Sequence, residues 1–377
     1  MALPNTRNIK SILVIKMRNI GDVLLTTPVF TNLREYYPGA RICALVNSGT
    51  EEMLTDNPVI DQVYVYERSI KAAPFIGRIA NELLFLNKIR AEHFDMVINL
   101  TDGDRGALVV FTSGAHRKFG VKSNGRGFLG KDKIFNIVVP HPPEGTHTVD
   151  QNLELLDAAG VPIFQKRVSF YFPGSIQAVV LKRLYDIGLI QGGYFHAHVT
   201  SRWMFKTMPP ATAARLLDLL AERAGFPCLL TSSPDPKERD YLNELQRHMN
   251  TPIPHFSDLR LKELGALTSM ARFFAGVDSA PMHIAAALNV PVLAVFGPSS
   301  AQNWGPWNND LDHNPYTVER GIQISGKHVV LQSGMECVPC HRDGCNGSKV
   351  SNCLDFDQET LEKTVSLFIE NIEQNIA

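Results

Sequence analysis

Residues 11–17 read SILVIKM, and a stretch with helical character follows at residues 22–37. The first stretch is a near-continuous apolar run, which is typical of a strand that is buried on both faces of a sheet. A strand followed closely by a helix is the repeating unit of a mostly parallel α/β sheet. The opening of the chain therefore predicts an α/β fold.

The same alternation continues through most of the chain. In the first half we expect strands at residues 41–46, 62–66 and 96–100, with a helix at 75–89. A second series begins near residue 174, with strands at 194–200, 228–232, 272–277 and 292–296, and helices at 210–224, 237–248, 261–270 and 282–288. The alternation predicts two Rossmann-like, doubly wound domains that bind ligands at the carboxyl ends of their strands, in the cleft where they face each other.

The expected domains are residues 1–170 and 171–356. The linker is placed at 161–174, a stretch with two prolines and little helical periodicity. Residues 357–377 form an amphipathic helix in this interpretation, and one arrangement packs that helix back on the N-terminal domain.

Composition excludes several classes of protein. The 377 residues are 44% apolar and 20% charged, as in ordinary globular chains, and the net charge of −1 gives no overall attraction to nucleic acid. No apolar run approaches the roughly 20 residues of a membrane-spanning helix, and residues 1–10 lack the apolar core of a signal peptide. These features predict a cytoplasmic protein without a transmembrane segment.

The segment KMRNIGD, residues 16–22, comes at the end of the first expected strand. Asp22 could act as a general base toward an acceptor hydroxyl, because a carboxylate at a strand end faces the expected cleft. The simpler alternative is that Asp22 only caps the following helix. The dinucleotide fingerprint G-x-G-x-x-G is absent, which weakens a dehydrogenase interpretation.

The segment DSAPMH, residues 278–283, joins an expected strand to an expected helix. Small residues, an early proline and free backbone N–H groups at a helix start suit an anion such as a diphosphate, with Ser279 and His283 as further donors. An ordinary helix capped by Asp278 or Ser279 is the alternative. A second turn at the same sheet edge, residues 297–300, favours a ligand site.

Two further segments carry positive charge. HVTSRWMFK, residues 198–206, puts hydroxyls and two cations after a strand and suits phosphate, unless it is a solvated loop with aromatic side chains in the core. Residues 117–133 hold six basic residues and one acid among glycines. A loop of this kind could hold a phosphorylated, membrane-borne acceptor, or could simply be solvated.

Four cysteines follow late in the chain with the spacing C-x2-C-x4-C-x7-C, at Cys337, Cys340, Cys345 and Cys353. This spacing is compatible with a structural zinc site, although its second half is looser than paired zinc knuckles. Reduced thiols are the favoured alternative, and we expect no catalytic role for them.

Taken together, these segments resemble glycosyltransferase family 9, the ADP-heptose:lipopolysaccharide heptosyltransferases. The resemblance rests on KMRNIGDVLL, HVTSRWMFK, DSAPMHIAAALNVPVLAVFGP and the WGPW turn at 304–307, and extends from about residue 10 to 310. It is greatest to the core heptosyltransferase III type. It implies a GT-B fold and an inverting, metal-independent transfer of L-glycero-D-manno-heptose from ADP-heptose to an inner-core heptose of lipopolysaccharide, with no required cofactor.

The resemblance also implies roles for individual residues. Asp22 corresponds to the general base, Lys206 to a lysine that contacts the diphosphate, and Glu238 to a glutamate near the donor adenosine. The implied donor site comprises Lys206, Thr200, Ser201, Glu238, Asp278, Ser279, Ala280, Pro281, Met282 and His283, and the implied acceptor site Arg18, Asn19, Arg117, Lys122 and Arg126. The chain departs from the family at Ala280, because family loops often read DSG there.

Other functions remain open on the sequence. The chain could be a core heptosyltransferase of the I or II type, a nucleotide-sugar epimerase on the same fold, or a non-catalytic nucleotide-binding protein. The expected partners are a nucleotide-sugar donor and a lipopolysaccharide core acceptor at the inner membrane, with no nucleic acid. The expected location is the cytoplasmic face of that membrane, to which the protein would be peripheral.

Overall fold

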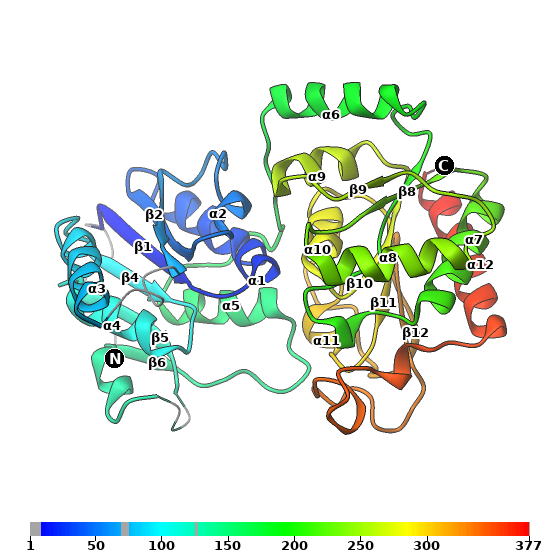
Figure 1. The fold of residues 1–377 in the computed structure, drawn as a ribbon. Coiled ribbons are helices and arrows are strands. Elements are labelled where there is room, and N and C mark those ends of the chain that lie inside the picture. The colour runs from blue at the N-terminus through cyan, green and yellow to red at the C-terminus, as the bar shows by residue number, and fades with distance from the viewer. Residues whose placement is uncertain (1–8, 69–74, 124, 126, 377) are drawn as a thin grey trace. The chain divides into compact units, whose positions relative to one another are not determined.

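Strand β1 occupies the centre of the first sheet of the computed structural model, which describes residues 9–68, 75–123, 125 and 127–376. All neighbouring strands of this six-stranded sheet are parallel, and their order is β3-β2-β1-β4-β5-β6 (Figure 1). The strands are β1 (Ser11–Lys16), β2 (Arg41–Asn47), β3 (Gln62–Tyr66), β4 (Met96–Asn99), β5 (Arg117–Val121) and β6 (Ile137–Val139). The order reverses between β1 and β4, and doubly wound sheets bind ligands outside the carboxyl ends of the strands at such a point.

Helices cover both faces of this sheet. They are α1 (Ile20–Leu24), α2 (Thr27–Tyr36), α3 (Phe75–Arg90), α4 (Asp104–Thr112) and α5 (Thr148–Ala158), with short 3₁₀ helices at Glu51–Met53 and Lys131–Ile134. Helix α3 packs beside α4, and α2 packs beside α5. The buried sides of α3 and α4 meet Leu13 and Ile15 of β1 in one apolar core.

The single helix expected at residues 22–37 is wrong, because the chain forms α1 and α2 with a break between them. Pro28 has no N–H, so it cannot donate to the carbonyl of Leu24 as a continuous helix would require. The hydroxyl of Thr27 donates to that carbonyl instead, at 3.0 Å. The break allows α1 to remain a short turn that carries Asp22.

The second sheet has seven strands in the order β12-β13-β11-β10-β7-β8-β9, of which only β12 is antiparallel to its neighbour. The strands are β7 (Phe195–His198), β8 (Cys228–Thr231), β9 (His255–Phe256), β10 (Phe274–Val277), β11 (Val292–Phe296), β12 (Gly321–Ser325) and β13 (His328–Gln332). Its order reverses between β7 and β10. A Cβ atom at Gly276 would lie 2.4 Å from the carbonyl oxygen of His198, so glycine is required where these two strands pair.

The helices of this part of the chain are α6 (Gly174–Asp186), α7 (Pro210–Ala224), α8 (Pro236–His248), α9 (Leu261–Ser269), α10 (Ala280–Ala287), α11 (Ala301–Trp304) and α12 (Gln358–Ile376). Short 3₁₀ helices lie at Met204–Lys206, Cys345–Gly347 and Asn352–Leu354. Helix α12 packs against α7 and β13 (Figure 1). Its Phe368 contacts Phe273 edge-on at 5.3 Å, inside the core of the second sheet. Helix α12 thus belongs to the second unit, and its packing on the N-terminal domain stays a prediction.

The chain divides into two compact units. The first ends at Tyr171 but omits Gly145–His147, which belong to the second unit together with the chain from Phe172 onward. The buried ring of His147 packs on Trp307 at 4.7 Å, and its Nε2 donates to the carbonyl of Gly305 at 3.0 Å. The chain therefore passes from one unit to the other three times.

No helix in the described ranges is both long enough and apolar enough to cross a membrane.

Candidate functional site

Asp22 lies in the first turn of α1, just beyond the carboxyl end of β1. Its Oδ2 accepts hydrogen bonds of 3.3 Å from the backbone N–H and from Nδ2 of Asn19. Asp22 therefore caps α1, as the simpler interpretation expects. Both bonds use one oxygen, and Oδ1 has no hydrogen-bond partner among the described residues, so capping leaves a carboxylate oxygen that can accept a proton.

A buried lysine that the sequence analysis did not assign to the site interacts with Asp22. Lys16 is 7% exposed, and its Nζ donates to the carbonyl of Leu100 at 3.2 Å and to Oδ1 of Asn152 at 3.0 Å. Burial lowers the pKa of Lys16, and the carboxylate of Asp22 acts against that change. A lysine at the end of an apolar strand was the signal for this residue.

Arg18 and Asn19 lie in the loop between β1 and α1, and both are exposed. Arg18 forms an ion pair with Asp102, which follows β4. Strands β1 and β4 are the neighbours between which the strand order reverses. The structure thus brings Asp22, Arg18, Asn19 and Asp102 to the sheet edge where ligands are expected.

The basic residues at 117–133 do not form one loop. Arg117 begins β5 and pairs with Met96, which pairs in turn with Ile12 of β1. Since each strand residue advances about 3.3 Å, Arg117 lies roughly 13 Å before the end of β1, toward the opposite sheet edge. The register separates Arg117 from Asp22 along the sheet, and acceptor binding by Arg117 stays a prediction. Lys122 does follow the carboxyl end of β5, and Arg126 lies outside the described residues.

In the second unit, Lys206, Asp278 and Ser299 come together from three segments, after β7, β10 and β11. Nζ of Lys206 donates to Oδ2 of Asp278 at 2.6 Å, and Oγ of Ser299 donates to the same oxygen at 2.5 Å. Burial raises the pKa of Asp278, but the charge and hydrogen bond of Lys206 and the bond from Ser299 outweigh it, so this pKa lies below its ordinary value. An ammonium has three donors, so Lys206 retains two for an anionic ligand.

The start of α10 lies directly after Asp278. Ser279 occupies the N-cap position, yet its side chain makes no capping bond, and its buried Oγ has no partner among the described residues. The capped-helix alternative is therefore wrong for the Ser279 hydroxyl. Ala280 is the first helical residue and does not have positive φ, so alanine causes no strain where the family often has glycine.

The remaining first-turn residues complete an anion-binding geometry. Pro281 and Met282 follow Ala280 in α10, and the helix start presents its positive dipole end. His283 is buried, and its Nδ1 has no partner among the described residues. Burial lowers the pKa of His283 to about 4, with Asp278 acting against this, so the ring is neutral near pH 7.

Glu238 is buried at the start of α8, where it receives three hydrogen bonds. The hydroxyl of Thr200 donates to its Oε2 at 2.7 Å, the backbone N–H of Ser233 to the same oxygen at 3.0 Å, and the Ser233 hydroxyl to Oε1 at 2.6 Å. His198 lies behind Thr200, and burial lowers the pKa of His198 to about 4. Glu238 and Thr200 thus meet at the carboxyl ends of β7 and β8.

Ser201 shapes the loop that carries Lys206. It is buried, and its Oγ accepts a 3.3 Å bond from the backbone N–H of Trp203. The solvated-loop alternative does not fit residues 198–201, which are buried, but it does fit the exposed Arg202 and Trp203. The exposed ring of Trp203 shows that not all of its aromatic side chains enter the core.

The four late cysteines are free thiols that differ in exposure, from exposed Cys337 to buried Cys353. Burial raises the pKa of Cys353 to about 12, and the other three thiols act in the same direction. Across the described part of the chain, no three or more His, Cys, Asp or Glu side chains are arranged to hold a metal ion.

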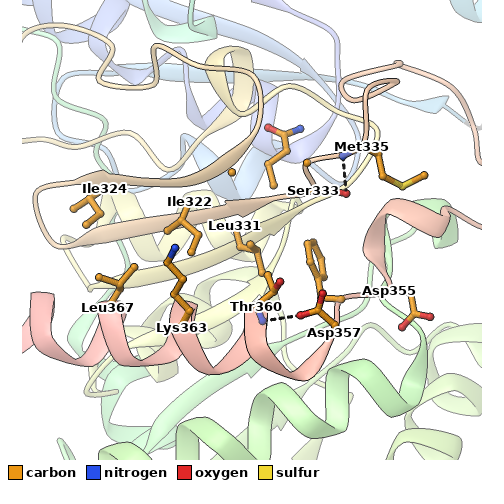
Figure 2. Close-up of a pocket in the computed structure, with 14 residues that line it drawn as sticks. Ile322, Ile324, Leu331, Ser333, Met335, Asp355, Asp357, Thr360, Lys363 and Leu367 are labelled. Carbon is orange, nitrogen blue, oxygen red and sulfur yellow. Dashed lines mark hydrogen bonds between the residues drawn. The ribbon is translucent and has the colours of Figure 1, made fainter.

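A groove of about 710 Å³ lies between β12, β13 and the first half of α12. Figure 2 shows Lys363 and Leu367 of α12 opposite Ile322 and Ile324 of β12. None of the residues assigned above to donor or acceptor binding lines this groove, so it is distinct from the candidate site.

Comparison with known proteins agrees with this geometry. The sequence profile of glycosyltransferase family 9 (heptosyltransferase) matches residues 83–324. The chain is 34% identical over 297 residues to lipopolysaccharide heptosyltransferase 3 of Escherichia coli, covering 78% of this chain and 86% of that protein.

Two solved structures share the fold. The glycosyl transferase family 9 protein from Veillonella parvula DSM 2008 superposes with a TM-score of 0.77 at 19% identity, covering 96% of this chain and 97% of that one. The E. coli ADP-heptose lps heptosyltransferase II gives a TM-score of 0.71 at 17% identity, covering 97% and 100% of the two chains. At these identities the likeness concerns the fold alone.

The predicted α/β fold of GT-B type, with two Rossmann-like units, is confirmed, and the protein is a glycosyltransferase. The chain belongs to glycosyltransferase family 9, the heptosyltransferases.

Proposed function

We propose that this enzyme transfers L-glycero-D-manno-heptose from ADP-heptose to an inner-core heptose of lipopolysaccharide, as a heptosyltransferase of the III type. The donor is suggested by the name of the related E. coli ADP-heptose lps heptosyltransferase II, and the type by the 34% identical E. coli heptosyltransferase 3. The cytoplasmic face of the inner membrane is the proposed place of reaction, with the protein peripheral to it.

The observation that carries the proposal is the cluster at the carboxyl ends of β10 and β11. It combines the ammonium of Lys206, the unpartnered hydroxyl of Ser279 and the N-terminal end of α10. These groups suit a diphosphate, since they supply a point charge, a hydroxyl donor and free backbone N–H groups. Glu238, beside Thr200, would then accept hydrogen bonds from the donor nucleoside.

The proposed reaction is a single displacement. Asp22 removes the proton from the acceptor hydroxyl, whose oxygen attacks the anomeric carbon opposite the diphosphate. The bond from that carbon to the leaving oxygen breaks, ADP departs with the electron pair, and the configuration inverts. Lys206 and the start of α10 stabilise the charge that develops on ADP, so the chain itself supplies the positive charge that a metal could otherwise provide.

Product analysis tests this function. The purified enzyme would be incubated with ADP-heptose alone and with a set of truncated core acceptors, and each product identified by mass and linkage. Heptose addition to an acceptor that already carries inner-core heptose is the expected result. Conversion of the donor without acceptor would identify an epimerase. Addition of heptose to a heptose-free core would identify a type I enzyme. A donor that stays intact in every incubation would identify a binding protein.

A further inference from the structure

Helix α3 presents an apolar face to solvent. Ile79, Leu83 and Leu84 are 45%, 55% and 67% exposed, although large aliphatic side chains are usually buried. Their spacing of four and five residues places them on one side of the helix. The adjoining side of α3 packs through Leu86 and Ile89 into the core of the first sheet, and Ile79, Leu83 and Leu84 are not part of that core.

A second group of exposed apolar residues lies at the start of α4. Leu129 is fully exposed and Phe128 is 44% exposed, in the segment that precedes the 3₁₀ helix at Lys131–Ile134. The backbone N–H of Phe128 donates to Asp104 of α4 at 3.3 Å, and the neighbouring Arg105 pairs with Glu82 of α3 at 3.1 Å. These two contacts connect the Phe128–Leu129 segment to α3 through the start of α4.

The charge around this surface is positive. Helix α3 carries Arg78, Lys88 and Arg90, all exposed, against the single acid Glu82. Glu82 is already paired with Arg105, whereas the three cations form no ion pair within the described part of the chain. An apolar helix face flanked by unpaired cations is the pattern of a helix that lies in the interface of an anionic bilayer.

We propose that this surface, Ile79, Leu83 and Leu84 of α3 with the Phe128–Leu129 tip, docks the protein on an anionic lipid bilayer. The inference goes beyond the proposed function, because transfer chemistry does not specify which surface meets lipid. A second copy of the chain is the less favoured partner, since two such faces would bring like charges together. A lipid surface supplies both the apolar layer and the negative charge.

Vesicle sedimentation of the full chain tests the proposal. Wild type should bind vesicles of phosphatidylethanolamine and phosphatidylglycerol and show little binding to phosphatidylcholine vesicles or in high salt. The L83E/L84E variant should bind the anionic vesicles at least about tenfold more weakly, because the exposed apolar groups no longer enter the interface. Each of K88Q and R90Q should weaken binding about fivefold.

Controls separate docking from folding and catalysis. V179E changes an apolar residue of α6 that is equally exposed, at 54%, and should bind vesicles as wild type does. L83E/L84E should retain the wild-type unfolding temperature and turn over a soluble, delipidated core acceptor normally. Turnover that fails for every variant and wild type alike would refute the proposed function without affecting the docking result.

Three results would overturn the docking proposal. The first is binding of L83E/L84E to anionic vesicles as tightly as wild type binds them. The second is equal binding of wild type to neutral and anionic vesicles. The third is no binding of wild type to any vesicle. A wild-type dimer that L83E/L84E converts to monomer in light scattering would assign this surface to self-association instead.

Discussion

Replacing Lys206 with methionine should destabilise the second unit through a charge left behind in the interior. Asp278 is 5% exposed, and Lys206 is the cation that pairs with it, at 2.6 Å. Breaking a buried pair by removing one partner typically costs 3–5 kcal/mol. Because 22% of the Lys206 side chain is exposed, we expect the lower end, about 3 kcal/mol. For a unit of this size, that is a fall in unfolding temperature of roughly 6–12 °C.

The loss of stability should depend on pH in a defined direction. In the folded protein the pKa of Asp278 lies below its ordinary value. Ionised Asp278 therefore stabilises the fold at every pH above its pKa in the unfolded chain, about 3.9. This stabilisation is lost as the pH falls through the folded pKa. Without Lys206, burial raises that pKa. The difference between wild type and K206M should therefore be largest near pH 7 and shrink below about pH 5.

Differential scanning calorimetry at several pH values measures both effects. K182M is the matched control, because Lys182 is exposed on α6 and forms no ion pair among the described residues. The double variant K206M/D278N should recover most of the lost stability at pH 7, since no uncompensated charge remains. A K206M deficit that is equal at pH 4 and pH 7, or that D278N does not relieve, would refute this account of the pair.

Three further predictions concern single residues. D22N should lower kcat at least about a hundredfold while isothermal titration shows unchanged ADP affinity, and near-normal turnover would remove Asp22 as the base. S279A should lower ADP affinity about fivefold and leave the unfolding temperature unchanged, because its hydroxyl has no partner among the residues that the structure describes; a destabilised S279A would assign the hydroxyl a structural role. His283 has a pKa of about 4 in the folded protein, so as the pH falls below about 6.5 this histidine is protonated in the unfolded chain before it is protonated in the folded one. The free energy of unfolding of the second unit should therefore fall by about 3 kcal/mol between pH 6.5 and 4. Urea unfolding of H283Q should show a shallower loss over that range, and an unchanged slope would contradict the assignment.

The sequence predicted β1 to β4, β7, β8, β10 and β11, most of which are apolar runs bounded by turn residues. It missed β6, β9, β12 and β13, although β13 is buried at every position. Strands β3 and β11 have the expected bounds, and helix α7 does too. Strand β5 was missed because its sequence, RKFGV, begins with two basic residues and contains Gly120. A Cβ atom at Gly120 would lie 2.4 Å from the ring of Phe135. This glycine therefore makes room for the phenylalanine ring against the strand and does not mark a loop.

The candidate site was harder to predict because its contacts join distant segments. The strand ends at Asp22 and Asp278 could be recognised locally, since each is a carboxylate between a strand and a helix. The pairing of Lys206 with Asp278 spans 72 residues, and the turn with Ser299 was noted without a partner for it. The position of Arg117 at the start of β5 was not predicted, because composition alone cannot tell at which end of a strand a basic residue lies.

The three-residue excursion at Gly145–His147 limits how this enzyme can be dissected. No single cut yields both halves intact: a fragment that starts at Phe172 lacks the imidazole that covers Trp307, and one that starts at Gly145 carries α5 away from the sheet it belongs to. A domain exchange within the family would therefore have to transfer Gly145–His147 together with the second unit, although this tripeptide lies within the sequence of the first.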